Sequence, residues 1–523
     1  MVSPFRCRFG FSRLNGLALS AFALCSVGFS QLTPTENRLL GDALAVGGLT
    51  VDDLNFARKS FEPRLGLPLV TKSLEKPLAG LVDSLEFQSN PSIDSSKLLR
   101  STVEKLFAET VKAPPDSNPP TFKNLLQIPL ELREPVASLF EAIRLSQIDV
   151  RTATSKLTPV EKRHLIESLA HWAVAGTDLQ IAFVKQKKMS REALYAALSK
   201  VDLALIRASA IRVSEAVDES LPKLRLAAAN GWAGKLKFSE GGVNVELTGV
   251  GDDLHSSGAT NLCIDLGGRN RYTDRYGAGI GYTGVLIDLG NEIKSEFPDA
   301  AAGAGILGIG IAHFDGFKTD LNGKNINFGA GLAGVGILTT EQSVRVESRS
   351  VGQGFGMAGI GLCIGSKGSD TYKLGYLGQG AGTMGGVGWS VNPGGNDRYR
   401  AGGVTTETSM TGAYVCRAQG FSGLMPGGIG LLTDTAGDDL YESGTETQAC
   451  AIGYGLAALV DSKGNDTYVA GFRAQSCAMF EGVAQFVDTE GDDGYLVRRG
   501  ECHAYAADRS VAILMDRSGD DIV

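Results

Sequence analysis

One eight-residue phrase recurs near the end of the 523-residue chain and limits what the chain can fold into. The phrase starts with Asp, has Gly at its fourth position and Asp at its sixth, and ends with Tyr in three of its four clearest copies. Successive copies are separated by 27, 27 and 28 residues. A fixed period of this size is typical of solenoids and other stacked arrays. The four copies begin at Asp434, Asp461, Asp488 and Asp516.

Each copy lies between two short apolar runs that resemble β-strands, such as the run at 456–460 and the run that starts at Tyr468. Gly next to Asn or Asp favours a tight turn, because these residues tolerate positive φ. Weaker copies extend upstream to about residue 243, which predicts about eleven stacked parallel coils. A propeller blade needs a period of about 40 residues or more, so the pattern favours a β-solenoid with coils of about 27 residues.

Two adjacent columns in the strand before the phrase have opposite character. One is bulky, as at Val335 and Ile360, and the next is small, as at Gly336 and Gly361. Neighbouring strand residues point to opposite faces, so the strand is apolar on both faces and should be buried on both. We predict a core on the bulky face and the close approach of another backbone layer at the small column.

A column of amides lies about thirteen residues before each phrase. It could form an inward-facing amide ladder, or it could occupy a solvent-facing turn, and the sequence does not decide between the two. Its members are Gln353, Gln379, Gln419, Gln448, Gln475 and, in the last coil, His503.

Residues 1–30 have the pattern of an export signal: a basic start, an apolar run at 14–27, and a small residue on each side of Phe29 before Gln31. An uncleaved membrane anchor is the alternative, but the apolar run is short for a membrane span. No later segment is apolar enough to cross a bilayer. We therefore expect an exported protein that is periplasmic, on the cell surface or secreted.

Residues 31–232 are predicted to form an α-helical domain with a Pro-rich loop at 114–120, and residues 243–523 an all-β solenoid. Thr158-Pro-Val-Glu161 matches a helix capping box, and Gly becomes abundant only after residue 231. Arrays need capped ends, so the simplest role of the helical domain is a cap. The net charge of −8 and the absence of a basic stripe argue against a nucleic-acid partner.

The aspartates of the phrase are the main candidates for a metal site. In a stacked array like charges would lie about 4.8 Å apart and repel by about 3–4 kcal/mol at an effective dielectric of 20. Either calcium lies between the coils, or the carboxylates cap turn amides in water. The candidate calcium ligands are Asp434, Asp461, Asp488 and Asp516 in the first column and Asp439, Asp466, Asp493 and Asp521 in the second.

Two other groups have metal-binding or redox side chains. His164, Glu167 and His171 share one face of a predicted helix, where a zinc site competes with the more common solvated polar face. Cys450 and Cys477 occupy equivalent positions in adjacent coils, so an exported chain could join them in a disulfide. Cys263 and Cys363 lie in a column of mostly Leu residues and are expected to fill the core.

The coils at 288–349 match the repeat least well, and an enzyme built on a solenoid should break its repeat where the substrate binds. A carbohydrate-active enzyme with an acidic site there is therefore the alternative to a non-enzymatic protein, although ordinary repeat decay explains the same pattern. The chain contains no Gly-x-Ser-x-Gly, His-Glu-x-x-His or phosphate-binding motif. The polar candidates in these coils are His313, Asp315, Asp320, Glu341, Arg345 and Glu347.

The segments at 352–372 and 378–399 read Gly-Gln-Gly, then an apolar run, then Gly-x-Asp-x-Tyr. In this pattern, residues 243–523 resemble a group of exported bacterial repeat proteins. The Gly-Asp turns also resemble, more distantly, calcium-binding toxin-type repeats, whose period is nine residues rather than 27. These resemblances imply export and modestly favour calcium, and they supply no reaction.

We therefore expect a non-enzymatic exported repeat protein with a structural or ligand-binding role at the cell envelope or outside the cell. Its partner would be a polysaccharide or an envelope component. An open strand edge at the last coil also favours end-to-end self-association.

Overall fold

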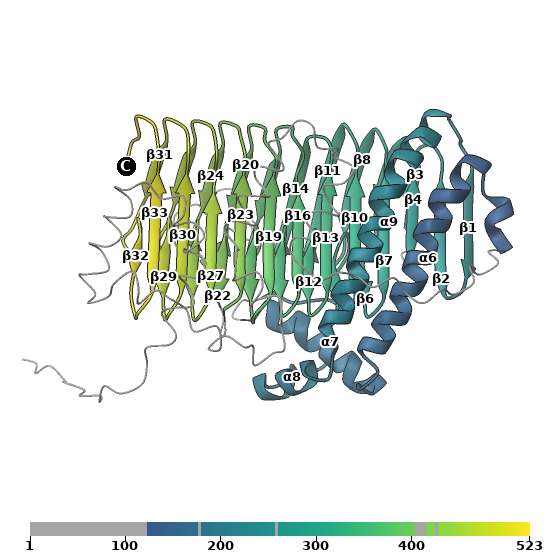
Figure 1. The fold of residues 1–523 in the computed structure, drawn as a ribbon, viewed down its shortest axis with the longest axis horizontal. Coiled ribbons are helices and arrows are strands. Elements are labelled where there is room, and N and C mark those ends of the chain that lie inside the picture. Colours follow the sequence, from purple (N-terminus) through teal and green to yellow (C-terminus); the bar gives the residue numbers. More distant parts are fainter. Residues whose placement is uncertain (1–122, 176–178, 257–259, 403–414, 424–426) are drawn as a thin grey trace, which may run out of the picture. The chain divides into compact units, whose positions relative to one another are not determined.

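The computed structural model describes residues 123–175, 179–256, 260–402, 415–423 and 427–523 (Figure 1). The expected signal peptide and the loop at 114–120 lie outside the described residues. The described helical part begins with a short 3-10 helix and ends six residues before the first strand. Its elements are η3 (Lys123–Gln127), α6 (Leu130–Ala153), α7 (Pro159–Ala173), α8 (Arg191–Leu198) and α9 (Leu203–Ala229).

The rest of the chain is a β-solenoid, as predicted, with three long sheets that we name A, B and C. Each coil visits A, then B, then C, and each strand pairs in parallel with its equivalent in the next coil. The one antiparallel strand at the start is β1, which pairs with β2. The predicted start of the solenoid at residue 243 is thus the second strand of a hairpin.

The strands of sheet A, in order, are β1 (Lys235–Glu240), β2 (Val243–Thr248), β4 (Leu262–Asp265), β7 (Thr283–Asp288), β10 (Ile309–Phe314), β13 (Val335–Thr340), β16 (Ile360–Ile364), β19 (Val387–Asn392), β23 (Ile429–Asp434), β27 (Leu456–Val460), β30 (Val483–Asp488) and β33 (Val511–Asp516). Those of sheet B are β3 (Asp253–His255), β5 (Arg269–Tyr272), β8 (Glu292–Phe297), β11 (Lys318–Asn327), β14 (Val344–Gly352), β17 (Thr371–Leu374), β20 (Arg398–Ala401), β24 (Leu440–Ser443), β28 (Thr467–Ala470) and β31 (Gly494–Val497). Those of sheet C are β6 (Gly279–Ile280), β9 (Gly305–Ile306), β12 (Ala330–Leu332), β15 (Phe355–Met357), β18 (Ala381–Thr383), β22 (Phe421–Gly423), β26 (Cys450–Ile452), β29 (Cys477–Met479) and β32 (Tyr505–Ala506). A further pair joins β21 (Val415–Ala418) to β25 (Thr445–Thr447).

The array has about nine turns at a spacing of about 26 residues, rather than the eleven predicted. The count differs because sheet C has fewer strands than sheet A, so the first and last coils lack one side. One coil is longer than the others: equivalent residues Asp397 and Asp439 are 42 positions apart. The extra length contains residues 403–414, which lie outside the described residues.

The long helices lie along the flank of the solenoid. Helices α6 and α9 pack on each other and contact β7, β10 and β13 of sheet A (Figure 1). The Ser146 hydroxyl of α6 is 2.6 Å from that of Thr283 on β7. Helix α7 begins with the predicted capping box, in which Thr158 and Glu161 bond each other's backbone N–H. The described helices therefore cover a side of the coils.

The enclosed core lies on the face of sheet A opposite to the one we predicted. Leu338, which shares a face with the small residue Gly336, packs with the buried tyrosines of sheet B. The bulky column points outward, since Thr283 belongs to it and contacts α6. The physical reason is the space between sheets A and C. The interior of the solenoid is narrow there and admits only the small residues of sheet A, so the bulky residues face outward, where they are covered from outside.

The close approach predicted at the small column is confirmed. A Cβ added to Gly361 would lie 2.0 Å from the carbonyl oxygen of Phe355 on sheet C, well inside van der Waals contact. In the later coils the column becomes Ala, and Ala457 and Ala484 pack against Ala451 and Ala478 of sheet C. The two sheets thus approach closely along the array.

The amide column forms the inward-facing ladder. Gln353, Gln379, Gln419, Gln448 and Gln475 are fully buried at corners where φ is between 48° and 53°. The Nε2 group of each donates to backbone carbonyls of the same or the next coil. His503, the last member of the column, is exposed.

Candidate functional site

The turn between sheets A and B places the first aspartate of each phrase inside the core. Asp461 directly follows β27, is fully buried, and accepts a hydrogen bond of 2.6 Å from the hydroxyl of Tyr441 in the preceding coil. The next coil repeats the contact, with 2.5 Å between Tyr468 and Asp488. The tyrosine rings also stack, with 4.8 Å between the centroids of Tyr441 and Tyr468. The first Asp and the Tyr of the phrase therefore tie successive coils together.

The second aspartate of the phrase caps the turn of the preceding coil. The backbone N–H of Asp439 donates to Oδ1 of Asp466 at 2.7 Å, and that of Asp466 donates to Oδ1 of Asp493 at 2.7 Å. Both acceptor side chains are buried. The aspartates thus cap turn amides, as one alternative proposed, but they do so away from water.

Glycine is required at the fourth position of the phrase. Gly464 has φ of 143°, and a Cβ there would lie 1.5 Å from the carbonyl oxygen of Gly437 in the preceding coil. The same close approach recurs at Gly437, Gly491 and Gly519. Stacking of the turns, and not only their curvature, therefore selects Gly.

The stacked turns bring three carboxylates together between successive coils. In each group, one first-column carboxylate lies between two of the second column, with the ligand oxygens within 4.8 Å of one another. The groups are Asp397, Asp434 and Asp439; Asp439, Asp461 and Asp466; Asp466, Asp488 and Asp493; and Asp493, Asp516 and Asp521. The candidate calcium ligands named from the sequence are thus brought together, and Asp397 is a member that the sequence reasoning missed because its phrase begins with Asn392.

Burial strongly favours the neutral form of these carboxyls. Burial and the charges of Asp434 and Asp461 raise the pKa of Asp439 to about 11. Burial and the Asp461 charge likewise raise the pKa of Asp466 to about 10. Removing a carboxylate from water costs several kcal/mol, and like charges nearby add to that cost. Each group therefore needs a proton or a cation.

The hydrogen bonds around Asp439, Asp461 and Asp466 fit a proton better than calcium. Four of the oxygens already accept bonds of 2.6, 2.6, 2.7 and 3.3 Å. Oδ2 of Asp439 is buried and has no donor. Calcium needs six to eight oxygen ligands, and each oxygen that accepts a hydrogen bond has fewer lone pairs to offer. A single proton on Oδ2 of Asp439 would neutralise that carboxyl and would let it donate one hydrogen bond within the group.

The acidic candidates of the weakest coils fall into two separate sets. Asp315 and Glu341 converge on Arg225 of helix α9, at 2.8 and 3.3 Å. Asp320, Arg345 and Glu347 lie on β11 and β14 of sheet B, where Arg345 approaches Glu347 at 3.0 Å. The first set lies in the turns that follow β10 and β13, and the second lies on strands of sheet B, so the acidic candidates form two sets instead of one.

His313 belongs to neither acidic set. It is buried, its Nδ1 lies 2.8 Å from the Thr339 hydroxyl, and burial lowers the pKa of its ring to about 3. A neutral imidazole held by a neighbouring hydroxyl can support the stacking of β10 on β13.

The helical group His164, Glu167 and His171 is used for local structure. Oε2 of Glu167 accepts the backbone N–H groups of Lys185 and Gln186 at 2.9 and 2.8 Å. His164 contacts the carbonyl oxygen of Lys187 instead of its helical neighbours. The three residues do not form a metal cluster among the described residues.

The six cysteines within the described residues are free thiols. Cys450 and Cys477 are register partners in sheet C, as the repeat predicted, but they form no disulfide. Cys263 and Cys363 are buried core residues, as expected. Burial raises the pKa of the Cys263 thiol to about 12, which favours its protonated form.

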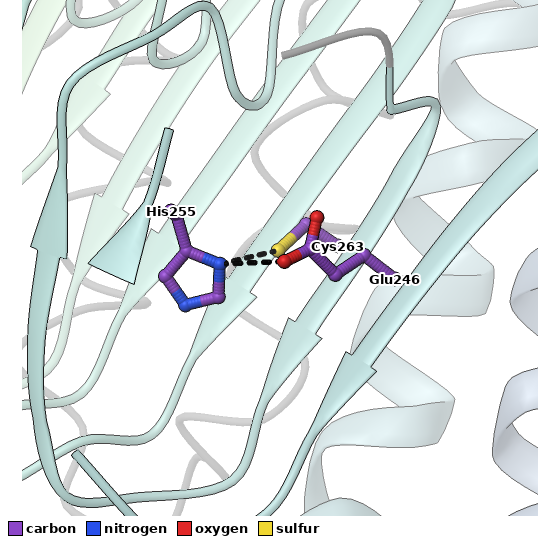
Figure 2. Close-up of side chains that lie close together, drawn as sticks. All are labelled: Glu246, His255 and Cys263. Atoms are coloured by element: carbon purple, nitrogen blue, oxygen red, sulfur yellow. Dashed lines mark hydrogen bonds and ion pairs between the residues drawn. The ribbon is translucent and has the colours of Figure 1, made fainter. Parts of the chain in front are cut away.

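One cluster in the first coils was missed by the sequence reasoning. Glu246, His255 and Cys263 point toward one another inside the solenoid (Figure 2). Burial alone would lower the pKa of His255, but bonds to Asp265, Cys263 and Glu246 raise it above the usual range. A signal was present: in Gly251-Asp-Asp-Leu-His255, His stands where the other phrases have Tyr.

Comparison of the chain with protein family models, curated proteins and solved structures found no match. None of the helices in the described part is both long and apolar enough to span a membrane.

Proposed function

We propose that the protein is an exported, non-enzymatic scaffold whose β-solenoid presents a long surface for binding at the cell envelope or outside the cell. One observation carries this proposal. The recurring Asp, Tyr and Gln side chains are directed into the array, where they bond the neighbouring coil. Side chains that are buried and hydrogen-bonded in this way support the stacking of the coils and are not available to a substrate.

The arrangement of the weak coils also supports a scaffold over a carbohydrate-active enzyme. An enzyme would need acidic groups that face one cleft and are free to exchange protons. Asp315 and Glu341 instead form ion pairs with Arg225, which ties helix α9 to the turns after β10 and β13. Loss of the repeat there is explained by helix docking.

The outer face of sheet B is the surface that we propose for ligand binding. Its strands alternate buried and outward side chains, and the outward ones form charged rows along the array. Lys373 bonds Glu347 of the preceding coil at 3.0 Å, and Arg400 approaches Glu442 of the next coil at 3.8 Å. Rows of alternating charge at a regular spacing suit an extended anionic or polar polysaccharide.

Export is tested by sequencing the N-terminus of the chain recovered from fractionated bacteria. The proposal predicts a mature chain that starts at Gln31 outside the cytoplasm. Full-length chain held in the cytoplasm would contradict it.

Binding is tested with the full chain against purified envelope polysaccharides by calorimetry. The double variant Lys373→Glu, Arg400→Glu should weaken binding at least tenfold, and Asp438→Asn, in the turns outside this face, should leave it unchanged. Turnover of a polysaccharide that is lost in Asp315→Asn would instead favour the enzyme.

Light scattering over a concentration series tests self-association through the edge of β33.

A further inference from the structure

The first two coils depart from the repeat at two inward positions. Glu246 on β2 pairs with Cys263, and Cys263 with Leu286, so a carboxylate occupies a column that is mostly Leu in later coils. His255 on β3 pairs with Tyr272, and the two rings stack at 4.5 Å. His255 therefore occupies the tyrosine column. The two residues that differ from the repeat lie next to each other inside the array, so the difference needs an explanation in the local structure.

The ligand atoms of Glu246, His255 and Cys263 lie within 4.8 Å of one another. His255 Nδ1 is 3.1 Å from Oε1 of Glu246 and 3.9 Å from Sγ of Cys263. Figure 2 marks both contacts with dashed lines. The exposed fractions of Glu246, His255 and Cys263 are 3, 1 and 0%. Tetrahedral zinc with ordinary bond lengths would separate the nitrogen from the oxygen by about 3.3 Å and from the sulfur by about 3.5 Å. Shifts of a few tenths of an ångström would bring the three atoms to those separations.

The other ring nitrogen is held as zinc-binding histidines are usually held. His255 Nε2 lies 2.9 Å from Oδ2 of Asp265, which also accepts the Thr248 hydroxyl at 2.7 Å. A carboxylate on the far nitrogen fixes the tautomer and directs the near nitrogen at the metal. Tyr272 makes the matching bond to Asp288 in the next coil. Stacking of the array thus accounts for the Asp265 contact, but it does not account for Nδ1 facing a carboxylate and a thiol.

We propose that Glu246, His255 and Cys263 bind one zinc ion that fastens the β1–β2 hairpin to the first coils. His255 would bind as the neutral imidazole and Cys263 as the thiolate, with the Nδ1 proton of His255 and the thiol proton of Cys263 both released to solvent on binding. Asp265 orients the histidine, and Tyr276, whose hydroxyl lies 3.1 Å from Oε2 of Glu246, holds the carboxylate. The ligands are buried, and the three of them leave the fourth position of a tetrahedral zinc to a water molecule or to the second oxygen of Glu246. The competing arrangement is a metal-free ion pair in which a protonated His255 lies between Glu246 and Asp265.

The test uses the full chain, purified without a histidine tag. Elemental analysis should give about one zinc per chain, the number for a single site. Cobalt should replace zinc and produce a thiolate-to-cobalt charge-transfer band. Cys263→Ser should abolish the band and lower the zinc content at least tenfold. Cys363→Ser is the matched control, because Cys363 is equally buried in the same column and has no histidine or glutamate partner, and it should keep both signals.

A second variant keeps the test decisive if Cys263→Ser fails to fold. His255→Tyr restores the residue of the repeat, so it should stack on Tyr272 and bond Asp265 while it binds no zinc. Asp265→Asn should weaken zinc binding about 10- to 100-fold, the usual effect of losing an orienting partner. A chelator should lower the melting temperature of the wild-type chain and leave that of His255→Tyr unchanged. The proposal is overturned if wild-type protein gives no cobalt–thiolate band, or if His255→Tyr folds and retains its zinc.

Discussion

Raising the pH should destabilise the coils that carry the stacked aspartates. The pKa is raised to about 9 in Asp397, to about 11 in Asp439 and to about 10 in Asp466, chiefly because burial disfavours the charged form. In the unfolded chain each aspartate has a pKa of about 3.9. The folded coils therefore hold protons that the unfolded chain releases above about pH 4.

The sign of the effect follows from this difference in bound protons. A raised folded-state pKa contributes stability that is complete below the unfolded pKa and is lost as pH rises through the folded pKa. Each retained proton changes the free energy of unfolding by about 1.4 kcal/mol per pH unit. Three fully retained protons give about 4 kcal/mol per pH unit, and a single retained proton gives about 1.4 kcal/mol per pH unit.

Amide hydrogen exchange between pH 5 and pH 8, corrected for the intrinsic pH dependence of exchange, measures this stability locally. Peptides that contain the N–H groups of Asp439 and Asp466, which donate to the next aspartate, should lose protection as the pH rises. Peptides from β12 and β15 of sheet C are the internal control, because these two strands contain no aspartate. The reasoning is refuted if protection in the aspartate coils is flat or rises over this range.

The isosteric variant Asp439→Asn separates a proton from calcium. If a proton balances the charge, the amide should stabilise the coils at pH 8 by about 1–3 kcal/mol and reduce the pH dependence. Asp438→Asn, at the exposed neighbouring position, should change stability by less than about 0.5 kcal/mol. If calcium occupies the group instead, Asp439→Asn should destabilise the coils, and a chelator should lower the melting temperature of the His255→Tyr chain, which lacks the proposed zinc site.

Three further substitutions test the contacts between elements. Gly464→Ala should cost about 3 kcal/mol or more in chemical denaturation, because its Cβ would overlap the preceding turn, whereas Gly500→Ala, which points into open space, should be nearly neutral. Tyr441→Phe should cost about 1–3 kcal/mol, because it leaves a buried carboxyl without its donor, and a neutral result in the same assay would contradict the tyrosine–aspartate ladder. Arg225→Gln should increase amide exchange in α9 by about fivefold through the loss of about 1 kcal/mol of ion pairing, and unchanged exchange would show that the helix is held by its apolar contacts alone.

The solenoid could be predicted because the residues that stack between coils recur in the sequence at the period of the repeat. Asp461, Gly464 and Tyr468 recur at a spacing of 27 residues since each one contacts its equivalents or their partners one layer away. The direction of the sheet A strand faces could not be predicted in the same way. Both columns are apolar, and only the position of α6, which the repeat does not encode, shows that Thr283 faces outward.

The candidate sites were predicted unevenly for a related reason. Comparison of equivalent positions in successive coils found the aspartate groups, because the aspartates recur at the period of the repeat. This comparison did not predict that the carboxyls are buried. It missed Glu246 and His255 because each lies in a column defined by other residue types. A search for departures from the repeat, made at inward positions and not only in the weakest coils, would have found both residues.

The buried polar ladders also explain how nearly identical coils keep a single register. Apolar columns alone would tolerate a shift of one strand by two residues, because the side chains would still face the same way. Such a shift would separate the hydroxyl of Tyr441 from Asp461 and leave a buried carboxyl without its donor, at a cost of about 1–3 kcal/mol per layer. The ladder of tyrosine and aspartate side chains therefore contributes more to the choice of a single strand register than to the net stability of the fold. A double-mutant cycle with Tyr441→Phe and Asp461→Asn should give a coupling energy of about 1–3 kcal/mol, whereas additive effects would mean that the apolar columns set the register by themselves.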